Sequence, residues 1–269
     1  RKALGAALAD DVIAQIRDDH DNAVFSYIPN TAEIAWYGLM EELRKRRRSQ
    51  VRDKLVAAQR AGKLDEALIE KLVLGGWPRG EKVAHKDVKL RTFISQEKNR
   101  MQMASHVYDI SYGTVRDGDT LVCVDDSIVR GTTLRQSILR ILARPNPKRI
   151  VIASTAPQIR YPDCYGIDMS RMKEFIAFRA AIALIKERKM ENLLDQVYES
   201  CVSQPYNSEN FVKQVYAPFT DQEISDKVAE IVTPENFEPE VEIIFQTVED
   251  LHIACPDHTG DWYFTGDFP

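Results

Sequence analysis

The chain has 269 residues, of which 44% are hydrophobic and 29% charged, and its formal net charge is −5. That length allows one large domain, or a domain with an appendage, and supplies enough chain for a sizeable core. The negative balance argues against a general nucleic-acid binder, and neither a signal peptide nor a membrane-length apolar run is evident, so no nucleic-acid or membrane partner is expected.

The first third of the chain is predicted to be mainly helical. Apolar residues recur at helical spacing over residues 3–18, and a short β-prone run at residues 24–28 ends before Pro29. Helical spacing returns over residues 33–74, with a break at Ala61-Gly62-Lys63, and therefore predicts a helical hairpin. The glycine-rich stretch at residues 75–80 ends it.

The first arm of this hairpin carries the basic run Arg44-Lys45-Arg46-Arg47-Arg48. Such a run is compatible with binding to nucleic acid or to an anionic substrate. The simpler interpretation is a solvated helix face whose charge is balanced by Asp65, Glu66 and Glu70 on the second arm.

The most informative stretch lies at residues 121–133. Four apolar residues, 121–124, predict a buried parallel strand, and the apolar pattern after Thr133 predicts a helix that opens near Thr132 and Thr133. The turn between them lies at the carboxyl end of a strand, where open α/β sheets place ligands. Gly131 lets the backbone come close to a ligand, and unpaired N–H groups at a helix start favour an anion. The turn is therefore predicted to hold a phosphate.

Two acidic residues, Asp125 and Asp126, precede this turn. Neighbouring carboxylates would repel a phosphate unless Mg²⁺ bridges them to it, or unless they accept hydrogen bonds from sugar hydroxyls. A phosphorylated sugar with a metal ion satisfies both halves of the pattern. The alternative is a surface strand end with an Asp-Asp-Ser helix cap, and Gly131 with the two threonines makes that alternative less favourable.

The next elements complete a β-α-β unit. Residues 149–153 predict a second buried strand, joined to the first by a right-handed crossover. The loop at residues 154–161 ends at the same edge of the sheet, and Arg160 is its candidate ligand contact. A helix is predicted over residues 171–188.

Beyond residue 190 fewer signals are present. Residues 220–223 resemble a capping box, and residues 241–245 are compatible with a strand or a helix. His252, Cys255 and His258 match no structural zinc spacing, so no zinc site is expected. The cysteines, Cys123, Cys164, Cys201 and Cys255, form no Cys-x-x-Cys pair, which favours reduced thiols and a cytoplasmic protein.

Residues 124–133 resemble the phosphoribosyl pyrophosphate (PRPP) motif of type I phosphoribosyltransferases, in the variant of the amidophosphoribosyltransferase family. Further stretches also resemble that family: residues 91–94, a second block at residues 156–162 and 165–169, and the terminal residues 264–269. Together they cover most of residues 21–180 and the last few.

The resemblance implies an α/β fold of the type I phosphoribosyltransferase kind: a mostly parallel, twisted sheet flanked by helices. It also implies a helical hairpin insertion at about residues 44–76 and a helical C-terminal extension. We expect a leading helix over residues 1–20, a phosphoribosyltransferase domain over 21–189 and an extension packed on it over 190–269. The family's glutaminase domain has no counterpart in the chain, so residues 1–20 are interpreted as a linker from a missing domain.

The implied reaction is the conversion of PRPP and glutamine-derived ammonia into 5-phosphoribosylamine and pyrophosphate, the first step of purine biosynthesis. The implied partners are PRPP, ammonia channelled from a glutaminase domain, purine nucleotides as inhibitors, and further copies of the chain in a homo-oligomer. The alternative is a non-catalytic regulator that senses PRPP or a nucleotide on the same fold.

The resemblance also assigns roles to residues. Asp125, Asp126 and Arg91 are the expected catalytic residues, and Asp125, Asp126 and Thr31 are expected to bind Mg²⁺. Expected substrate contacts are Ser127, Ile128, Val129, Arg130, Gly131, Thr132, Thr133, Arg100, Lys86 and Arg160.

Some of these assignments have alternatives. Thr31 is equally compatible with a plain helix N-cap, Arg100 with a surface charge, and the cationic contact of Lys86 with Lys89 or His85. No iron–sulfur cluster is expected, because Trp262, Tyr263 and Phe264 stand where related proteins have a cluster cysteine.

Overall fold

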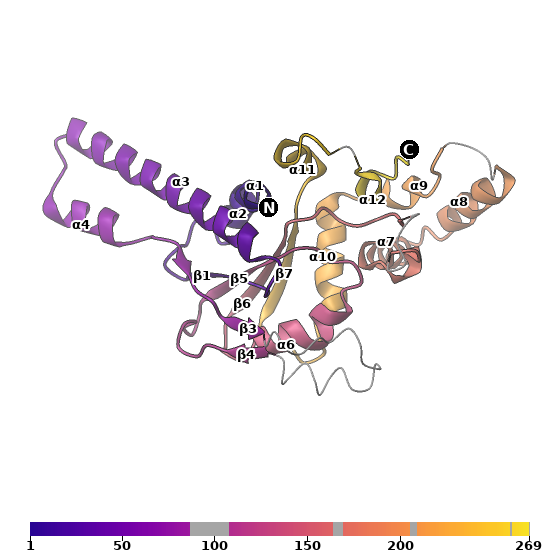
Figure 1. Cartoon of the computed structure of the whole chain (residues 1–269), viewed down its shortest axis with the longest axis horizontal. Helices are drawn as coiled ribbons and strands as arrows, with labels where there is room; N and C mark the ends of the chain where they lie inside the picture. The colour runs from indigo at the N-terminus through magenta and orange to yellow at the C-terminus, as the bar shows by residue number, and fades with distance from the viewer. Residues whose placement is uncertain (87–107, 164–168, 205–208, 259, 269) are drawn as a thin grey trace.

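The computed structural model describes residues 1–86, 108–163, 169–204, 209–258 and 260–268. Its centre is a parallel five-stranded sheet in the order β2-β1-β5-β6-β7 (Figure 1). The strands are β1 Ala23–Tyr27, β2 Arg79–Gly80, β5 Thr120–Asp125, β6 Arg149–Ser154 and β7 Glu240–Phe245. A separate antiparallel pair is formed by β3 Ala84–Lys86 and β4 Tyr108–Ile110. The described strands therefore confirm the predicted parallel α/β architecture.

The two central strands are apolar throughout because both faces of the sheet are covered. In β5, Leu121 and Cys123 face one core cluster, whereas Val122 and Val124 face the other. The register pairs Val122 with Val151, so β6 alternates in step with β5. The sequence of a parallel strand that is buried on both sides is therefore a continuous hydrophobic run.

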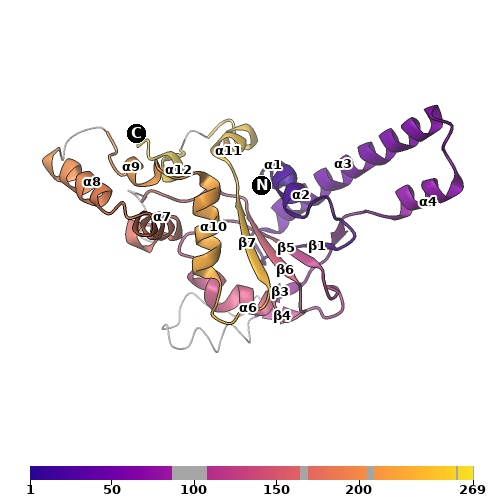
Figure 2. The ribbon, with the colours of Figure 1, turned by 180° about the vertical axis from the view of Figure 1, so that it is seen from behind.

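Helices form a layer on each face of the sheet (Figure 2). One cluster unites the sheet with α2 Ala9–Gln15 and the first half of α3 Glu33–Arg60, and α1 Lys2–Ala7 packs against α3. The other unites it with α6 Leu139–Leu142, α7 Ile176–Glu187 and α10 Asp221–Val232. Before α6 the chain is helical from Thr132 and forms a π-helical turn at Leu134–Ile138. The helix predicted to open near Thr132 and Thr133 is therefore confirmed.

The predicted hairpin is present, and it projects from one end of the molecule (Figures 1 and 2). Its arms are α3 and α4 Glu66–Leu74. Arg47 is buried, and its guanidinium donates hydrogen bonds to the carbonyl oxygens of Gly75, at 2.6 Å, and Leu72, at 3.3 Å. The basic run is therefore not a wholly solvated face: one arginine anchors the end of α4 against α3.

The ion pairs of the basic run also differ from the prediction. Arg46 pairs with Asp10 of α2 and with Glu42 one turn earlier, and Lys45 pairs with Glu42. Asp65 instead caps the start of α4 by accepting a hydrogen bond from the N–H of Leu68 at 2.8 Å. Among the described residues, Asp65, Glu66 and Glu70 form no ion pair with the basic run, so the expected charge balance from the second arm is not formed.

The carboxyl-terminal segment contains α8 Asn192–Ser203, α9 Lys213–Tyr216, α10, β7, α11 Val248–Ala254 and α12 Trp262–Thr265. Residues 241–245 form a strand, and β7 pairs in parallel with β6 along the edge of the sheet. The segment expected to form an extension over residues 190–269 supplies one strand of the central sheet.

Two predicted helices differ in detail. The leading helix is two short helices, α1 and α2, and the helix expected over residues 171–188 is a 3₁₀ turn at Met172–Glu174 followed by α7. None of the helices in the described ranges combines the length and the apolar character needed to span a bilayer.

Candidate functional site

The acidic pair lies where β5 ends. Asp125 is the last residue of the strand, and the chain turns through residues 126–131 before it becomes helical at Thr132. The Asp126 N–H donates to the Asp125 carboxylate at 2.8 Å, and the Ser127 N–H donates to the Asp126 carboxylate at 3.0 Å. These short local bonds hold both carboxylates at the carboxyl edge of the sheet.

Asp125 and Asp126 differ in their surroundings. Asp125 is partly buried and Asp126 is exposed. Burial, together with the neighbouring Asp126 carboxylate, raises the pKa of Asp125 to about 8. A carboxylate with a raised pKa is disfavoured in its charged form until a cation or a donor compensates it. The pair is therefore suited to a ligand that brings positive charge or hydroxyl groups.

Gly131 is required by the shape of the turn. Its φ is +69°, and a Cβ at this position would lie 2.8 Å from Cγ1 of Val232 and 3.2 Å from Cδ1 of Ile176. Any larger residue would be strained by the left-handed backbone and would press against α7 and α10. The turn is thus set by two distant helices as well as by its own sequence.

The other turn residues have distinct surroundings. Ile128 is buried in the core, so only its backbone is available to a ligand. The carbonyl of Val129 accepts a hydrogen bond from the N–H of Ile176 at 2.8 Å. The guanidinium of Arg130 pairs with Glu174 at 2.9 Å. Thr132 and Thr133 are exposed at the start of the helix.

A neighbouring loop supports the acidic pair. Thr155, directly after β6, is 7% exposed. Its N–H donates to the carbonyl of Asp125 at 2.9 Å, and its hydroxyl donates to the carbonyl of Asp126 at 3.2 Å. One residue of the β6 loop therefore holds the backbone of both acids.

The loop after β1 lies at the same edge, because the N–H of Ile28 donates to the carbonyl of Val124 at 2.8 Å. Thr31 is exposed in that loop. The N-cap of α3 is Ala32, without a side-chain capping bond, so the alternative of Thr31 as a plain N-cap is wrong. Its predicted contact with a metal ion stays a prediction.

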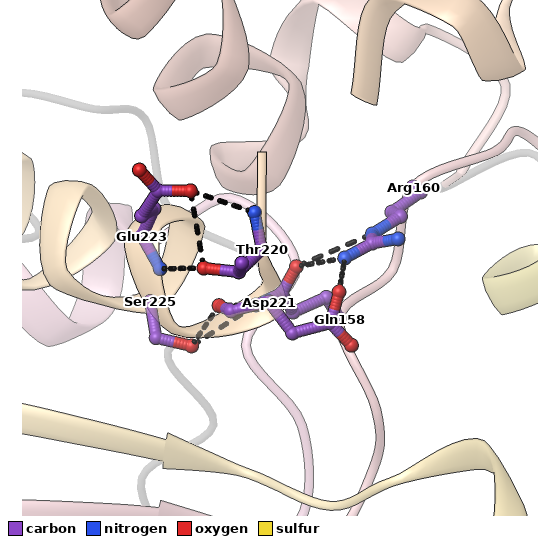
Figure 3. A network of polar contacts seen from close by, with 6 residues as sticks. All are labelled: Gln158, Arg160, Thr220, Asp221, Glu223 and Ser225. Atoms are coloured by element: carbon purple, nitrogen blue, oxygen red, sulfur yellow. Dashed lines mark hydrogen bonds and ion pairs between the residues drawn. The ribbon is translucent and has the colours of Figure 1, made fainter. Parts of the chain in front are cut away.

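Arg160 belongs to a polar network with the start of α10 (Figure 3). Its guanidinium donates to Gln158 at 2.8 Å, pairs with Asp221 and lies over the ring of Tyr216 at 5.1 Å. The network continues through Gln158 to Ser225 at 3.0 Å. Arg160 thus lies at the predicted edge of the sheet, although its described bonds go to protein groups.

The start of α10 confirms the predicted capping box. The Thr220 hydroxyl accepts from the Glu223 N–H, and the Glu223 carboxylate accepts from the Thr220 N–H (Figure 3). The hydrogen bonds that the Glu223 carboxylate accepts from the Thr220 N–H, from the Arg188 guanidinium and from the Thr220 hydroxyl lower the pKa of Glu223.

The remaining predicted contacts are spread over other elements. Lys86 ends β3, and His85 of the same strand lies 2.8 Å from the hydroxyl of Ser111. Arg91, Arg100 and Lys89 lie outside the described residues, and so do residues 165–168 of the block at 156–162 and 165–169 that resembles the family. The roles expected of these residues therefore stay predictions.

A cavity of about 310 Å³ lies next to Arg160. It is bounded by α2, the loop after β6, the start of α10, the end of β7 and Phe264, and its polar lining includes Arg160, Gln158 and Asp221. Neither Asp125 nor Asp126 lines it. The two carboxylates are therefore not part of this cavity. Within the described ranges, no group of three or more His, Cys, Asp or Glu side chains is placed to hold a metal ion.

Three supporting residues escaped the sequence analysis: Thr155, Ile176 and Val232. Thr155 adjoins a predicted strand, so its position at the edge could have been inferred, but its bonds could not. Ile176 and Val232 read as ordinary apolar helix positions, and only the packing of α7 and α10 brings them against Gly131.

No protein-family model matches the chain. An amidophosphoribosyltransferase of Pseudomonas aeruginosa is 30% identical over 182 residues, which make up 66% of this chain and 28% of that protein. An amidophosphoribosyltransferase of Escherichia coli is 38% identical over 98 residues, 36% of this chain and 19% of that protein. The chain therefore spans less than a third of the length of these curated relatives.

The solved structures agree in fold. The glutamine PRPP amidotransferase from B. subtilis, complexed with ADP and GMP, superposes with a TM-score of 0.54 at 20% identity, over 100% of this chain and 41% of that one. At this identity the superposition establishes the fold, and the sequence matches establish the relationship. The chain is therefore a homologue of the amidophosphoribosyltransferases over one part of their length, and it has the type I phosphoribosyltransferase fold.

Proposed function

We propose that the chain binds PRPP at the carboxyl edge of its sheet and transfers the phosphoribosyl group to ammonia, releasing pyrophosphate. The observation that carries this proposal is the arrangement at the end of β5: two carboxylates, a glycine-dependent turn, and a helix start that follows at Thr132. Similarity to amidophosphoribosyltransferases supports the same reaction.

The turn at residues 127–133 is suited to the 5-phosphate. Backbone N–H groups at the start of a helix attract an anion, and the exposed hydroxyls of Thr132 and Thr133 add donors. Binding energy from this remote phosphate would orient the reacting carbon without itself taking part in the reaction.

Asp125 and Asp126 are suited to the sugar hydroxyls and to Mg²⁺. In proteins, Mg²⁺ is commonly held by one or two carboxylates, with substrate phosphates and water completing its shell. Two adjacent carboxylates at an open edge fit that donor set, and Thr31 is a further candidate from the loop after β1. When bound, the ion would neutralise charge on the diphosphate leaving group.

The chain's own residues account for the rest of the reaction. In the transfer, the bond from C1 of the ribose to the diphosphate oxygen breaks and a C–N bond to ammonia forms. The carboxylates of Asp125 and Asp126 favour the positive charge that develops on the sugar ring. Ammonia is itself a sufficient nucleophile, so the proposal requires no general base. Arg91, Arg100 and Lys86 complete the proposed contacts to the diphosphate.

The wider setting follows from the same proposal. Ammonia would come from glutamine through a glutaminase domain, in keeping with the name of the B. subtilis enzyme, and purine nucleotides would compete at the phosphate turn. We place the activity in the cytoplasm, in keeping with the free thiols of Cys123, Cys201 and Cys255.

Release of pyrophosphate from PRPP tests the proposal. The chain should release it only when ammonia and Mg²⁺ are both supplied, and Asp125→Asn/Asp126→Asn should lower the rate by at least about a hundredfold, since electrostatic stabilisation of this kind is worth that much. Arg140→Glu, on the exposed side of α6, serves as the control and should retain activity. Tight PRPP binding without turnover would instead favour a sensor of PRPP.

A further inference from the structure

The turn after β5 is contacted at three successive residues by the segment that begins α7. The N–H of Ile176 donates to the carbonyl of Val129 at 2.8 Å. The guanidinium of Arg130 pairs with the carboxylate of Glu174 at 2.9 Å. Gly131 lies against the side chain of Ile176, since a Cβ on the glycine would be 3.2 Å from Cδ1. The segment therefore holds the turn by a hydrogen bond, an ion pair and a packing contact.

The hydrogen bond serves both of its partners. Ile176 is the first residue of α7, and its N-cap, Phe175, forms no side-chain capping bond. The first N–H groups of a helix need acceptors from outside the helix. The carbonyl of Val129 is such an acceptor, and the positive end of the helix dipole favours its oxygen. The turn thus caps α7, and α7 fixes the orientation of the peptide unit between Val129 and Arg130.

The orientation of this peptide unit separates the backbone of Arg130 from its side chain. In a planar trans peptide the C=O and the N–H point in opposite directions. Because the Val129 carbonyl points at α7, the N–H of Arg130 points away from α7. The guanidinium of Arg130, in contrast, is held by the segment before α7 through its pair with Glu174. The two contacts with this segment therefore set the backbone and the side chain of Arg130 independently.

The carboxylate of Glu174 is placed for this pair by its own surroundings. Glu174 ends the 3₁₀ turn, where its N–H donates to the carbonyl of Arg171 at 3.0 Å, and the next residue, Phe175, is fully buried. The side chains of Arg130 and Glu174 are 46% and 32% exposed, so water only partly screens the pair. A guanidinium held in this way is a poor anchor for a phosphate, because it would have to break the pair before it could bind the anion.

We propose that Glu174 is a positioning residue for the phosphate turn. It holds Arg130, and through Arg130 it holds the turn in the shape that presents backbone N–H groups to the 5-phosphate. The guanidinium of Arg130 thus supports the turn and does not contact the phosphate. This inference rests on the proposed binding of PRPP at the turn, and it adds a residue on a distant segment to that site.

A direct contact between Arg130 and the phosphate predicts the opposite result for one variant. If the guanidinium bound the phosphate, Glu174 would compete with the ligand, so Glu174→Gln should lower KM for PRPP while Arg130→Gln raises it. If Glu174 positions the turn, both variants lose the same ion pair. Each should then raise KM about two- to fivefold, the range expected of an exposed pair, and leave kcat within about twofold of the wild-type value.

The first test measures pyrophosphate release by the wild-type chain, the two single variants and the double variant. The double variant should be no worse than either single variant, because the two substitutions remove one interaction. Arg171→Gln is the matched control: its guanidinium lies 3.7 Å from the same carboxylate and its side chain is 70% exposed, so KM should not change. A lower KM in Glu174→Gln, or a double variant in which the two single effects multiply, would overturn the proposal.

The second test needs no ligand. Amide hydrogen exchange, followed by NMR, reports how firmly the N–H of Ile176 is bonded to the turn. We expect this N–H to exchange about two- to fivefold faster in Glu174→Gln and in Arg130→Gln, and at the wild-type rate in Arg171→Gln. An unchanged rate in Glu174→Gln would overturn the positioning role. A wild-type chain that does not bind PRPP would refute the proposed function instead, and the exchange rates would still decide whether Glu174 holds the turn.

Discussion

Replacing Gly131 by alanine perturbs the phosphate turn in two separable ways. The φ of +69° places a side chain in the left-handed region, which costs about 1–2 kcal/mol for a residue other than glycine. The new Cβ also lies 2.8 Å from Val232 and 3.2 Å from Ile176, and overpacking of this kind costs about 1–3 kcal/mol. We therefore expect Gly131→Ala to lower the free energy of unfolding by about 2–5 kcal/mol, less about 0.4–1 kcal/mol from the stiffer unfolded chain.

Gly62 provides a matched control. Its φ is +65°, close to that of Gly131, but no atom lies within 4 Å of the position that its Cβ would occupy. Gly62→Ala therefore carries only the cost of the left-handed backbone conformation. The stiffer unfolded chain offsets about 0.4–1 kcal/mol of that cost. Its free energy of unfolding should therefore fall by about 1 kcal/mol or less. The difference between the variants isolates the contact with α7 and α10.

Urea unfolding of both variants measures these free energies, and calorimetric titration with PRPP measures binding. Gly131→Ala should also bind PRPP at least tenfold more weakly, since relief of the contact displaces the turn, whereas Gly62→Ala should bind normally. Val232→Ala should recover part of the stability that Gly131→Ala loses. Equal effects of the two glycine substitutions, or normal PRPP binding by Gly131→Ala, would refute the role assigned to this turn.

Two further predictions concern the acidic pair. Thr155→Val removes the hydroxyl that donates to the Asp126 carbonyl at 3.2 Å, and it should raise KM for PRPP severalfold, corresponding to about 1 kcal/mol. Thr155→Ser keeps the hydroxyl and should restore the wild-type KM. Equal KM values for the two variants would show that the hydroxyl does not position the acidic pair. Because the pKa of Asp125 is raised from 3.8 to about 8, its protonated form stabilises the folded chain at low pH, and that contribution is lost as pH rises from about 4 to 8. In the wild-type chain, the free energy of unfolding measured in urea should therefore decline over this range by at most about 1.4 kcal/mol per pH unit, and Asp125→Asn should remove that decline. Identical pH slopes in the wild-type chain and in Asp125→Asn would contradict the raised pKa.

The features predicted well from the sequence are those set by neighbouring residues. The strand at residues 121–124, the turn at Gly131 and the start of the helix that follows all lie within fifteen residues, and each has a strong local signal. The hairpin could also be predicted from the sequence, because the helical periodicity over residues 33–74 and the break at Gly62 do not depend on the rest of the fold.

The features that were missed depend on contacts between distant segments. Residues 241–245 have no local signal that distinguishes a strand from a helix. They form a strand because they pair with β6. Arg47 belongs to a run of five basic residues, yet only α4 makes it the buried member. Arg160 likewise bonds to Asp221, sixty-one residues later in the chain. Sequence patterns identify such residues as polar, but the fold determines which groups they contact.

The most direct measurement is a crystal structure of the chain grown with PRPP and Mg²⁺. It should show the 5-phosphate against the backbone N–H groups of residues 129–133, and the ribose hydroxyls against Asp125 and Asp126. Density for PRPP in the cavity beside Arg160, with the turn after β5 unchanged and without ligand, would contradict the assignment of this edge as the substrate site.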